Sequence, residues 1–156
     1  KIIKVNKPLV LDADGLNCLA SQKDARNNWI LTPHPGEGKR LLGKDCQADR
    51  INSAIELSKL YRAIIVLKGP GTLISNEEGD VGLCPYGNPG MAVGGMGDIL
   101  AGVIGALVAQ GITNFESAKL AVVLHSFAAD KIAQEQGKIG LLATDLLPEI
   151  RRLINS

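Results

Sequence analysis

The chain has 156 residues and a formal net charge of +1; 46% of the residues are hydrophobic and 21% are charged. A chain of this length fits one domain and removes about 70% of its unfolded surface from water on folding. The even charge balance excludes a basic nucleic-acid-binding surface and an acidic tail, so we expect a small-molecule partner and no nucleic acid.

The first half of the chain alternates short apolar runs with helical patterns. The runs predict strands at residues 9–11, 29–31, 63–67, 72–75 and 80–86. Helices are expected over residues 37–42, where Gly43 supplies the stop, and from a cap at Asp45 to Tyr61. The last two strands flank a turn, which predicts an antiparallel hairpin near one edge of a mixed sheet.

Helices fill the second half of the chain. We expect them at residues 98–110, closed by Gly111, at residues 115–136, and at residues 144–154, capped by Thr144. No internal repeat or linker interrupts the pattern, so a single unit is favoured over two domains.

Strands that alternate with helices predict an α/β fold with an open, mostly parallel sheet flanked by helices. Such sheets bind ligands at the carboxyl ends of their strands. Asp12, Asp14, His34 and Lys68 all follow predicted strands, which makes this edge of the sheet the expected site.

The cysteines and the apolar stretches indicate the cellular setting. Cys18, Cys46 and Cys84 lack the C-x-x-C and Cys/His spacings of a metal site, so we expect reduced thiols, a cytoplasmic protein and no protein-held metal. The apolar stretches around residues 99–109 and 120–129 are too short to cross a bilayer, so no membrane association is expected.

A glycine-rich segment, residues 87–98, leads directly into a predicted apolar helix. Its glycines allow the backbone to approach a ligand, and free amides at the helix start favour an anion such as phosphate. The segment lacks the Lys-Ser/Thr of a Walker A loop and the spacing of a dinucleotide-binding loop. Asp98 at its end is then either a base that takes a proton from an attacking hydroxyl or an acid that stabilises the helix start.

Three motifs in this order carry a family resemblance. Residues 32–37 read TPHPGE, residues 68–72 read KGPGT and residues 88–98 read NPGMAVGGMGD; together they closely resemble the NAD(P)H-hydrate dehydratases of the ribokinase-like superfamily. Residues 140–148 also resemble the family's C-terminal signature, so the similarity covers essentially the whole chain.

The resemblance implies repair of nicotinamide cofactors. Hydrated NADH or NADPH is dehydrated at the expense of ADP in the bacterial branch or ATP in the eukaryotic branch, with Mg²⁺. The bacterial-looking tail favours ADP. A fused N-terminal epimerase domain and a homo-oligomer, commonly a tetramer, are also implied.

Residue roles follow from the matched motifs. The resemblance makes Asp98 the base on the substrate hydroxyl and a substrate-binding residue, and His34 a contact to the hydrated cofactor. The phosphoryl anion hole is assigned to the amides of Gly94, Gly95 and Gly97. The nucleotide-binding residues are Lys68, Gly69, Pro70, Gly71, Thr72 and Gly97.

Other interpretations of these residues stay open. His34 could also be a turn residue that binds no ligand. Residues 68–72 could also form only a strand exit and a tight turn. Asp12, Asp14 and Asn17 either touch substrate or a magnesium-bound phosphate, or cap the next helix. His125 lies among apolar residues and is expected to be buried and hydrogen-bonded.

Two departures from the family pattern qualify the resemblance. Val93 stands where the family often has a small hydroxyl residue, so a side-chain hydrogen bond would be lost there while the backbone amides remain. Dehydratases of this family also have an α/β segment before the strand at residues 9–11. Residues 1–156 therefore resemble the C-terminal portion of one domain, with part of the substrate pocket missing and an unpaired sheet edge.

Two rival functions remain. One is a small-molecule kinase of the same superfamily, acting on a sugar or a vitamin precursor, in which Asp98 would activate an alcohol. The other is a non-catalytic nucleotide-binding fragment. His34 within TPHPGE argues against the kinase.

Overall fold

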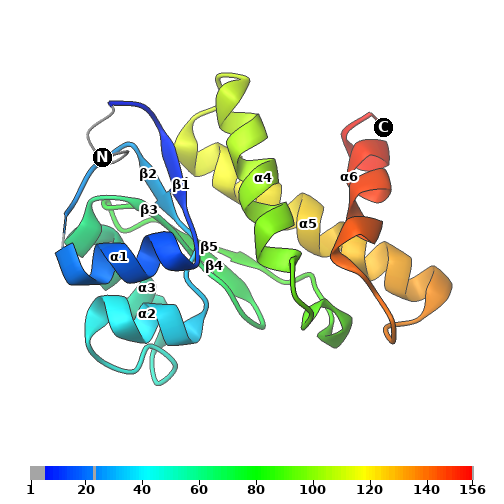
Figure 1. The fold of residues 1–156 in the computed structure, drawn as a ribbon, viewed down its shortest axis with the longest axis horizontal. Coiled ribbons are helices and arrows are strands. Elements are labelled where there is room, and N and C mark those ends of the chain that lie inside the picture. Colours follow the sequence, from blue (N-terminus) through cyan, green and yellow to red (C-terminus); the bar gives the residue numbers. More distant parts are fainter. Residues whose placement is uncertain (1–5, 23, 156) are drawn as a thin grey trace.

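A five-stranded sheet lies between two layers of helices in the computed structural model, which describes residues 6–22 and 24–155 (Figure 1). The strands are β1 (Leu9–Leu11), β2 (Trp29–Leu31), β3 (Ile64–Leu67), β4 (Thr72–Ser75) and β5 (Val81–Cys84), in that spatial order. β1, β2 and β3 pair in parallel, whereas β3–β4 and β4–β5 pair antiparallel. The open α/β sheet and its mixed character are confirmed; the parallel part is the β1–β3 half.

Alternate residues of the strands enter two separate cores, as the twofold side-chain period of a strand requires. Ile30, Val66 and Ile74 face one core, whereas Leu31 and Ile65 face the other. Both faces of β2 and β3 are therefore buried, which explains why these strands appear as continuous apolar runs.

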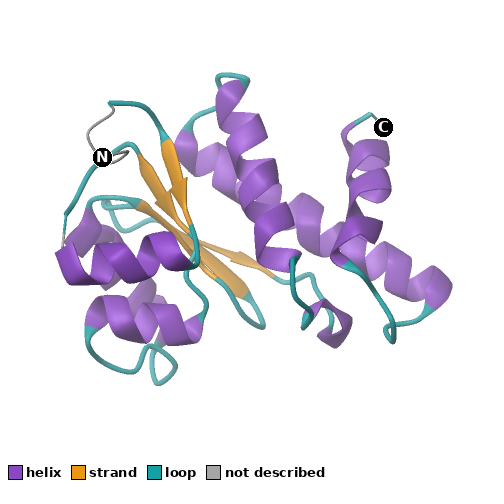
Figure 2. Ribbon diagram, in the orientation of Figure 1, coloured by secondary structure: helices purple, strands orange, loops and turns teal. Residues whose placement is uncertain are grey.

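One face of the sheet is covered by α1 (Asp14–Gln22), α2 (Pro35–Leu42) and α3 (Arg50–Tyr61). On the opposite face lie α4 (Met96–Ala109) and α5 (Asn114–Gln136), and α6 (Leu146–Ile154) packs on α5 away from the sheet (Figure 2). The short helices η2 (Pro89–Met91) and η3 (Ala143–Asp145) lie in the connections before α4 and α6. The glycine-rich segment thus links the β5 edge of the sheet to the start of α4.

Two predicted helix caps are wrong. Asp49, not Asp45, caps α3, and its side chain accepts from the Asn52 amide at 3.1 Å. This bond lowers the pKa of Asp49 because it favours the charged carboxylate. Thr144 does not cap α6; it lies inside η3, where the Asp145 side chain accepts from the Leu142 amide at 2.8 Å. Asp49 therefore takes the place of Asp45 at the start of α3, and Asp145, not Thr144, makes the side-chain hydrogen bond just before α6.

The turns also differ from the predicted element ends. α1 follows Ala13, whose φ of 47° lies in the left-handed region, and its nine residues carry only two buried side chains, so its periodicity is weak in the sequence. β5 is shorter than predicted because Asp80 belongs to the turn, where its amide donates to Asn76 Oδ1 at 2.8 Å. α4 begins two residues before Asp98, at Met96, because Gly95 takes a left-handed φ of 89° just before it.

Within the described part of the chain, no helix is long and apolar enough to cross a membrane. All three cysteines are free: Cys18 is exposed, and Cys46 and Cys84 are buried.

Candidate functional site

Two strand ends and the start of α4 converge on the Lys68 side chain. Lys68 follows β3, and its Nζ donates to Asp12 Oδ1, just after β1, at 2.7 Å. A Cβ placed on Gly97 would lie 3.0 Å from Asp12 Oδ2 and 3.3 Å from Lys68 Nζ. Gly97 therefore lets the backbone of α4 approach this ion pair, at the sheet edge where ligands of α/β folds bind.

Glu37 connects Lys68 to the His34 turn. Its Oε2 lies 4.0 Å from Lys68 Nζ and accepts from the His34 amide at 2.8 Å, while Oε1 lies 3.5 Å from His34 Nε2. The Glu37 side chain is only 6% exposed, so the Lys68 charge stabilises a carboxylate held away from water. A backbone hydrogen bond also joins Lys68 to the His34 turn: the Lys68 amide donates to the Pro33 carbonyl at 2.8 Å.

His34 is the N-cap of α2. Its Nδ1 accepts from the Gly36 amide at 3.0 Å, and together with Glu37 it forms a capping box. The side chain is nevertheless 51% exposed, so the ring can contact a ligand while it holds the turn. The turn interpretation and the ligand interpretation are therefore compatible; contact with a cofactor stays a prediction.

The run of residues 68–72 forms a tight turn held by Arg50. Arg50 Nη1 donates to the Pro70 carbonyl, and Nη2 donates to the Leu67 carbonyl at 3.2 Å. Gly69 and Gly71 have left-handed φ values of 139° and 65°. The Thr72 hydroxyl donates to the Gly69 carbonyl at 3.1 Å, which closes the turn. The strand exit and tight turn are present, and they give this loop one defined shape.

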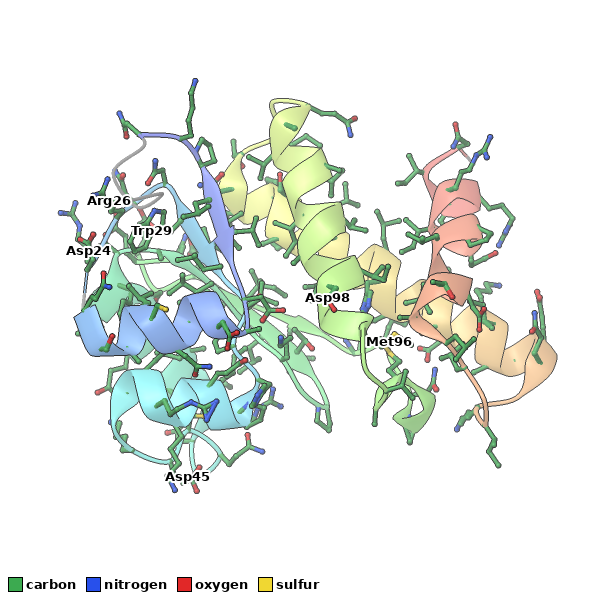
Figure 3. All side chains as sticks on the ribbon, viewed as in Figure 1. Asp24, Arg26, Trp29, Asp45, Met96 and Asp98 are labelled. Atoms are coloured by element: carbon green, nitrogen blue, oxygen red, sulfur yellow. The ribbon has the colours of Figure 1, made fainter. Side chains whose placement is uncertain are left out.

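The first turn of α4 offers backbone donors beside the Lys68 charge. The first helical hydrogen bond runs from the Ile99 amide to the Gly95 carbonyl at 3.1 Å, so the amides of Met96, Gly97 and Asp98 precede it. Such amides and the helix dipole favour an anion. Asp98 lies in this turn and is exposed, at the same end of α4 as Met96 (Figure 3).

The other glycines of the segment are arranged differently. A Cβ on Gly94 would meet no atom within 4 Å, whereas one on Gly95 would lie 3.2 Å from the Ala143 Cβ. Gly94 and Gly95 are both exposed. Their amides lie next to the helix start, and their assignment to an anion hole stays a prediction.

The structure thus brings together part of the predicted site. Asp12, Lys68 and Gly97 meet directly, and His34 joins them through Glu37. Asp14 and Asn17 lie instead on the exposed side of α1, where Asn17 Nδ2 donates to Asp14 Oδ1 at 3.4 Å. No role was predicted for Glu37 and Arg50. The three-residue spacing of a capping box could have indicated Glu37, but no pattern in the sequence indicates Arg50.

His125 is buried, as predicted, but it is not fully hydrogen-bonded. Its Nε2 has no partner among the described residues. Burial lowers the pKa of His125 to about 4. The nearby Lys68 charge also lowers this pKa, whereas a hydrogen bond to the Met96 backbone raises it by a smaller amount. The ring is therefore neutral near pH 7, close to both the start of α4 and the Lys68 charge.

Acidification is expected to destabilise the protein through His125. Because the pKa falls from 6.5 to about 4 on folding, the unfolded chain takes up a proton first. The stability is then fully present above about pH 6.5 and is lost as the pH falls toward 4, by up to about 1.4 kcal/mol per pH unit. Urea unfolding at pH 7 and pH 5 should show this loss, and His125→Gln should reduce it. Equal pH dependence in both proteins would contradict the assignment.

Comparisons with known proteins show the family of this chain. A family model described as NAD(P)H-hydrate dehydratase matches residues 1–152. The bifunctional NAD(P)H-hydrate repair enzyme Nnr of Coxiella burnetii is 52% identical, and the match covers 99% of this chain and 32% of that protein. The ADP-dependent (S)-NAD(P)H-hydrate dehydratase of Neisseria meningitidis is 42% identical, over 96% of this chain and 54% of that protein. The chain thus spans between a third and about half of these relatives.

Solved structures share the fold. The ADP/ATP-dependent NAD(P)H-hydrate dehydratase of Bacillus subtilis, co-crystallised with ATP/Mg²⁺ and soaked with CoA, superposes with a TM-score of 0.88 at 32% identity. That match covers 99% of this chain and 59% of the other. A ribokinase-like protein of Enterococcus faecalis superposes with a TM-score of 0.82 at 26% identity, over 94% of this chain and 52% of the other. The predicted ribokinase-like fold is confirmed.

Proposed function

We propose, since the chain belongs to the NAD(P)H-hydrate dehydratase family, that the protein dehydrates hydrated NADH and NADPH at the expense of a nucleotide. ADP is the proposed nucleotide, because the Neisseria meningitidis relative is named an ADP-dependent enzyme. The observation that carries the proposal is the approach of Gly97 to the Lys68–Asp12 pair, with Asp98 as the next residue. The proposal is supported by a cation and helix-start amides that lie close together, with a carboxylate at the next position of the helix, since phosphoryl transfer uses groups of these kinds.

The reaction needs the substrate's hydroxyl to become a better leaving group. In the first step, Asp98 takes the proton of the hydroxyl on the hydrated ring carbon while that oxygen forms a bond to the terminal phosphorus of ADP. The bond between this phosphorus and the bridging oxygen breaks, and AMP leaves. In the second step, the ring nitrogen's lone pair expels phosphate, and loss of a proton from the neighbouring carbon restores the reduced nicotinamide.

The position of each residue suggests its role in the proposed reaction. Lys68 neutralises charge on the nucleotide phosphates, and the amides at the start of α4 bind the transferred phosphoryl group, in which negative charge spreads over the oxygens. His34 is exposed on the neighbouring turn and is proposed to contact the hydrated cofactor. The run of residues 68–72, with its defined turn, is proposed to bind the nucleotide.

Mg²⁺ fits this site as an ion that arrives with the nucleotide. Within residues 6–22 and 24–155, no group of three or more His, Cys, Asp or Glu side chains could hold a metal. Mg²⁺ does not need one, since it binds through one or two carboxylates, waters and substrate phosphates. We infer that Asp12, which lies at the Lys68 side chain, supplies such a carboxylate. When bound, Mg²⁺ would neutralise charge on the phosphates.

Loosening the nucleotide turn should weaken nucleotide binding. Arg50→Gln removes the charged donor that holds the Leu67 and Pro70 carbonyls, so the turn must be ordered when ADP binds. We expect the ADP Kd to rise roughly fivefold, for a cost of about 1 kcal/mol. Calorimetric titration would measure the change. Arg62→Gln is the control, because Arg62 contacts only Glu77 at the surface, at 3.5 Å, among the ion pairs described; equal Kd values for the two variants would contradict the role of Arg50.

Residues 1–156 are proposed to be the C-terminal portion of one ribokinase-like domain. β1 is an edge strand, and a groove of about 400 Å³ runs between it and α4, lined by Leu9, Val10, Ala101 and Val108 among others. An apolar groove beside an open strand edge suits a further strand and helix. A fused epimerase domain, as the names of the bifunctional relatives suggest, a homo-oligomer and a cytoplasmic location belong to the same proposal.

The direct test is an activity assay on the protein in its full natural length. Enzymatically hydrated NADH is incubated with ADP or with ATP, and the absorbance of reduced nicotinamide is followed. Recovery with ADP, with one phosphate released per NADH, is expected. No recovery with either nucleotide would exclude the dehydratase. A stable phosphorylated alcohol would indicate a kinase, and thermal stabilisation by nucleotide without turnover would indicate a binding module.

A further inference from the structure

The start of the glycine-rich segment contacts helix α5 through Asp130. The Gly87 amide donates to Asp130 Oδ2 at 2.8 Å, and Asn88 Nδ2 donates to Asp130 Oδ1 at 2.9 Å. Both carboxylate oxygens are thus used by neutral donors of the segment. Among the described residues, Asp130 forms no ion pair within 4.0 Å, so its charge serves these bonds and not a cation.

Asn88 transmits this contact into the segment. Its Oδ1 accepts from the Gly90 amide at 3.0 Å, which makes Asn88 the N-cap of η2. Because the oxygen is engaged there, the Asn88 amide cannot turn over without losing that cap. The direction of the Asn88–Asp130 hydrogen bond is therefore determined, with Asn88 as donor.

The far end of the segment also rests on α5. Met96, the first residue of α4, belongs to the same buried core cluster as Ala128, Ala129 and Ile132 of α5. Met96 is only 6% exposed, so this contact is enclosed. Between the two ends, a Cβ on Gly90 would lie 2.5 Å from the Lys138 carbonyl oxygen, just after α5.

We propose that α5 is the platform that shapes the glycine-rich segment, with Asp130 as the positioning residue at the start of the segment and the packing of Met96 on α5 at its end. The inference rests on the proposed function, because it gives the segment the phosphoryl-binding role. A glycine-rich backbone loses much conformational entropy when it is ordered. Contacts that order it before substrate binds hold the α4 amides in the catalytic geometry, and a displacement of about 1 Å there can cost about 100-fold in rate.

An exchange of donor and acceptor tests the platform. Asp130→Asn leaves one acceptor oxygen for two donors, so its NH₂ group must face either the Asn88 NH₂ group or the Gly87 amide. Asn88→Asp places two carboxylates face to face. The double variant restores every bond: the carboxylate now at position 88 would accept from the amide now at position 130 and from Gly90, and the amide oxygen at position 130 would accept from Gly87. Net charge is the same in the double variant and the wild type. Glu135→Gln is the control, since it removes one charge from the exposed end of α5.

Two measurements are made on the full-length protein. Each single variant should lower kcat at least about tenfold with little change in the KM for ADP, because residues 68–72 are untouched. The double variant should recover to within about fivefold of the wild type. Hydrogen exchange of the amides of residues 94–98 should quicken in the single variants, and remain unchanged in α3 and in Glu135→Gln.

The outcomes separate the inference from the proposed function. A double variant no better than Asp130→Asn, or exchange at residues 94–98 equal to the wild type in both single variants, would overturn the platform. A wild-type protein without dehydratase activity would overturn the proposed function, and the exchange measurement would still decide on the platform.

Discussion

Asp98→Asn is expected to lower turnover at least about 100-fold and to leave ADP binding nearly unchanged, because a general base typically contributes 10²–10⁴-fold. Asn has nearly the same shape but cannot take the proton of the substrate hydroxyl. ADP affinity is retained since Lys68 and residues 68–72 are untouched. The exposed position of Asp98 in the first turn of α4, beside Gly97, makes the carboxylate accessible to substrate.

The control distinguishes a base from an acid that only stabilises a helix start. Asp14→Asn removes a carboxylate from the first turn of α1, where it is also exposed. Such an acid contributes about 0.3–1 kcal/mol to stability and nothing to proton transfer. Single-turnover rates with hydrated NADH and ADP would be compared, and Asp98→Asn rates equal to those of Asp14→Asn would refute the base.

Lys68→Met is expected to raise the ADP Kd by roughly 10- to 100-fold, because a hydrogen bond to a charged group is worth about 1.5–3 kcal/mol. The variant should also be less stable, since Asp12 and the nearly buried Glu37 lose their shared cation. Methionine keeps much of the apolar stem, so the loss reports on the charge.

Lys59→Met provides the matched comparison, since Lys59 is exposed on α3. ADP binding would be measured by calorimetry and stability by urea unfolding for both variants. A Kd for Lys68→Met within twofold of the wild type would show that Lys68 only pairs with Asp12 and Glu37 and does not bind the nucleotide.

Strands, which are encoded by residues consecutive in the sequence, were predicted correctly. All five strands lie within the predicted runs. For β2 and β3 the reason is burial on both faces of the sheet, which leaves continuous apolar stretches. Helix starts were less certain: Asp45 and Asp49 are both acceptable caps in sequence, and only the folded chain brings Asp49 to the Asn52 amide. α1 was not delimited at all, because only Leu16 and Leu19 of its residues are buried.

The sequence by itself determined the strand order along the chain, the family motifs, and the glycine-rich segment that ends at Asp98, because each is encoded in consecutive residues. Only the tertiary structure decided which charges meet. Lys68 reaches Asp12 across 56 residues, and Asn88 reaches Asp130 across 42. Such contacts depend on how parallel strands and helices align in space, and no periodicity in the chain records that alignment.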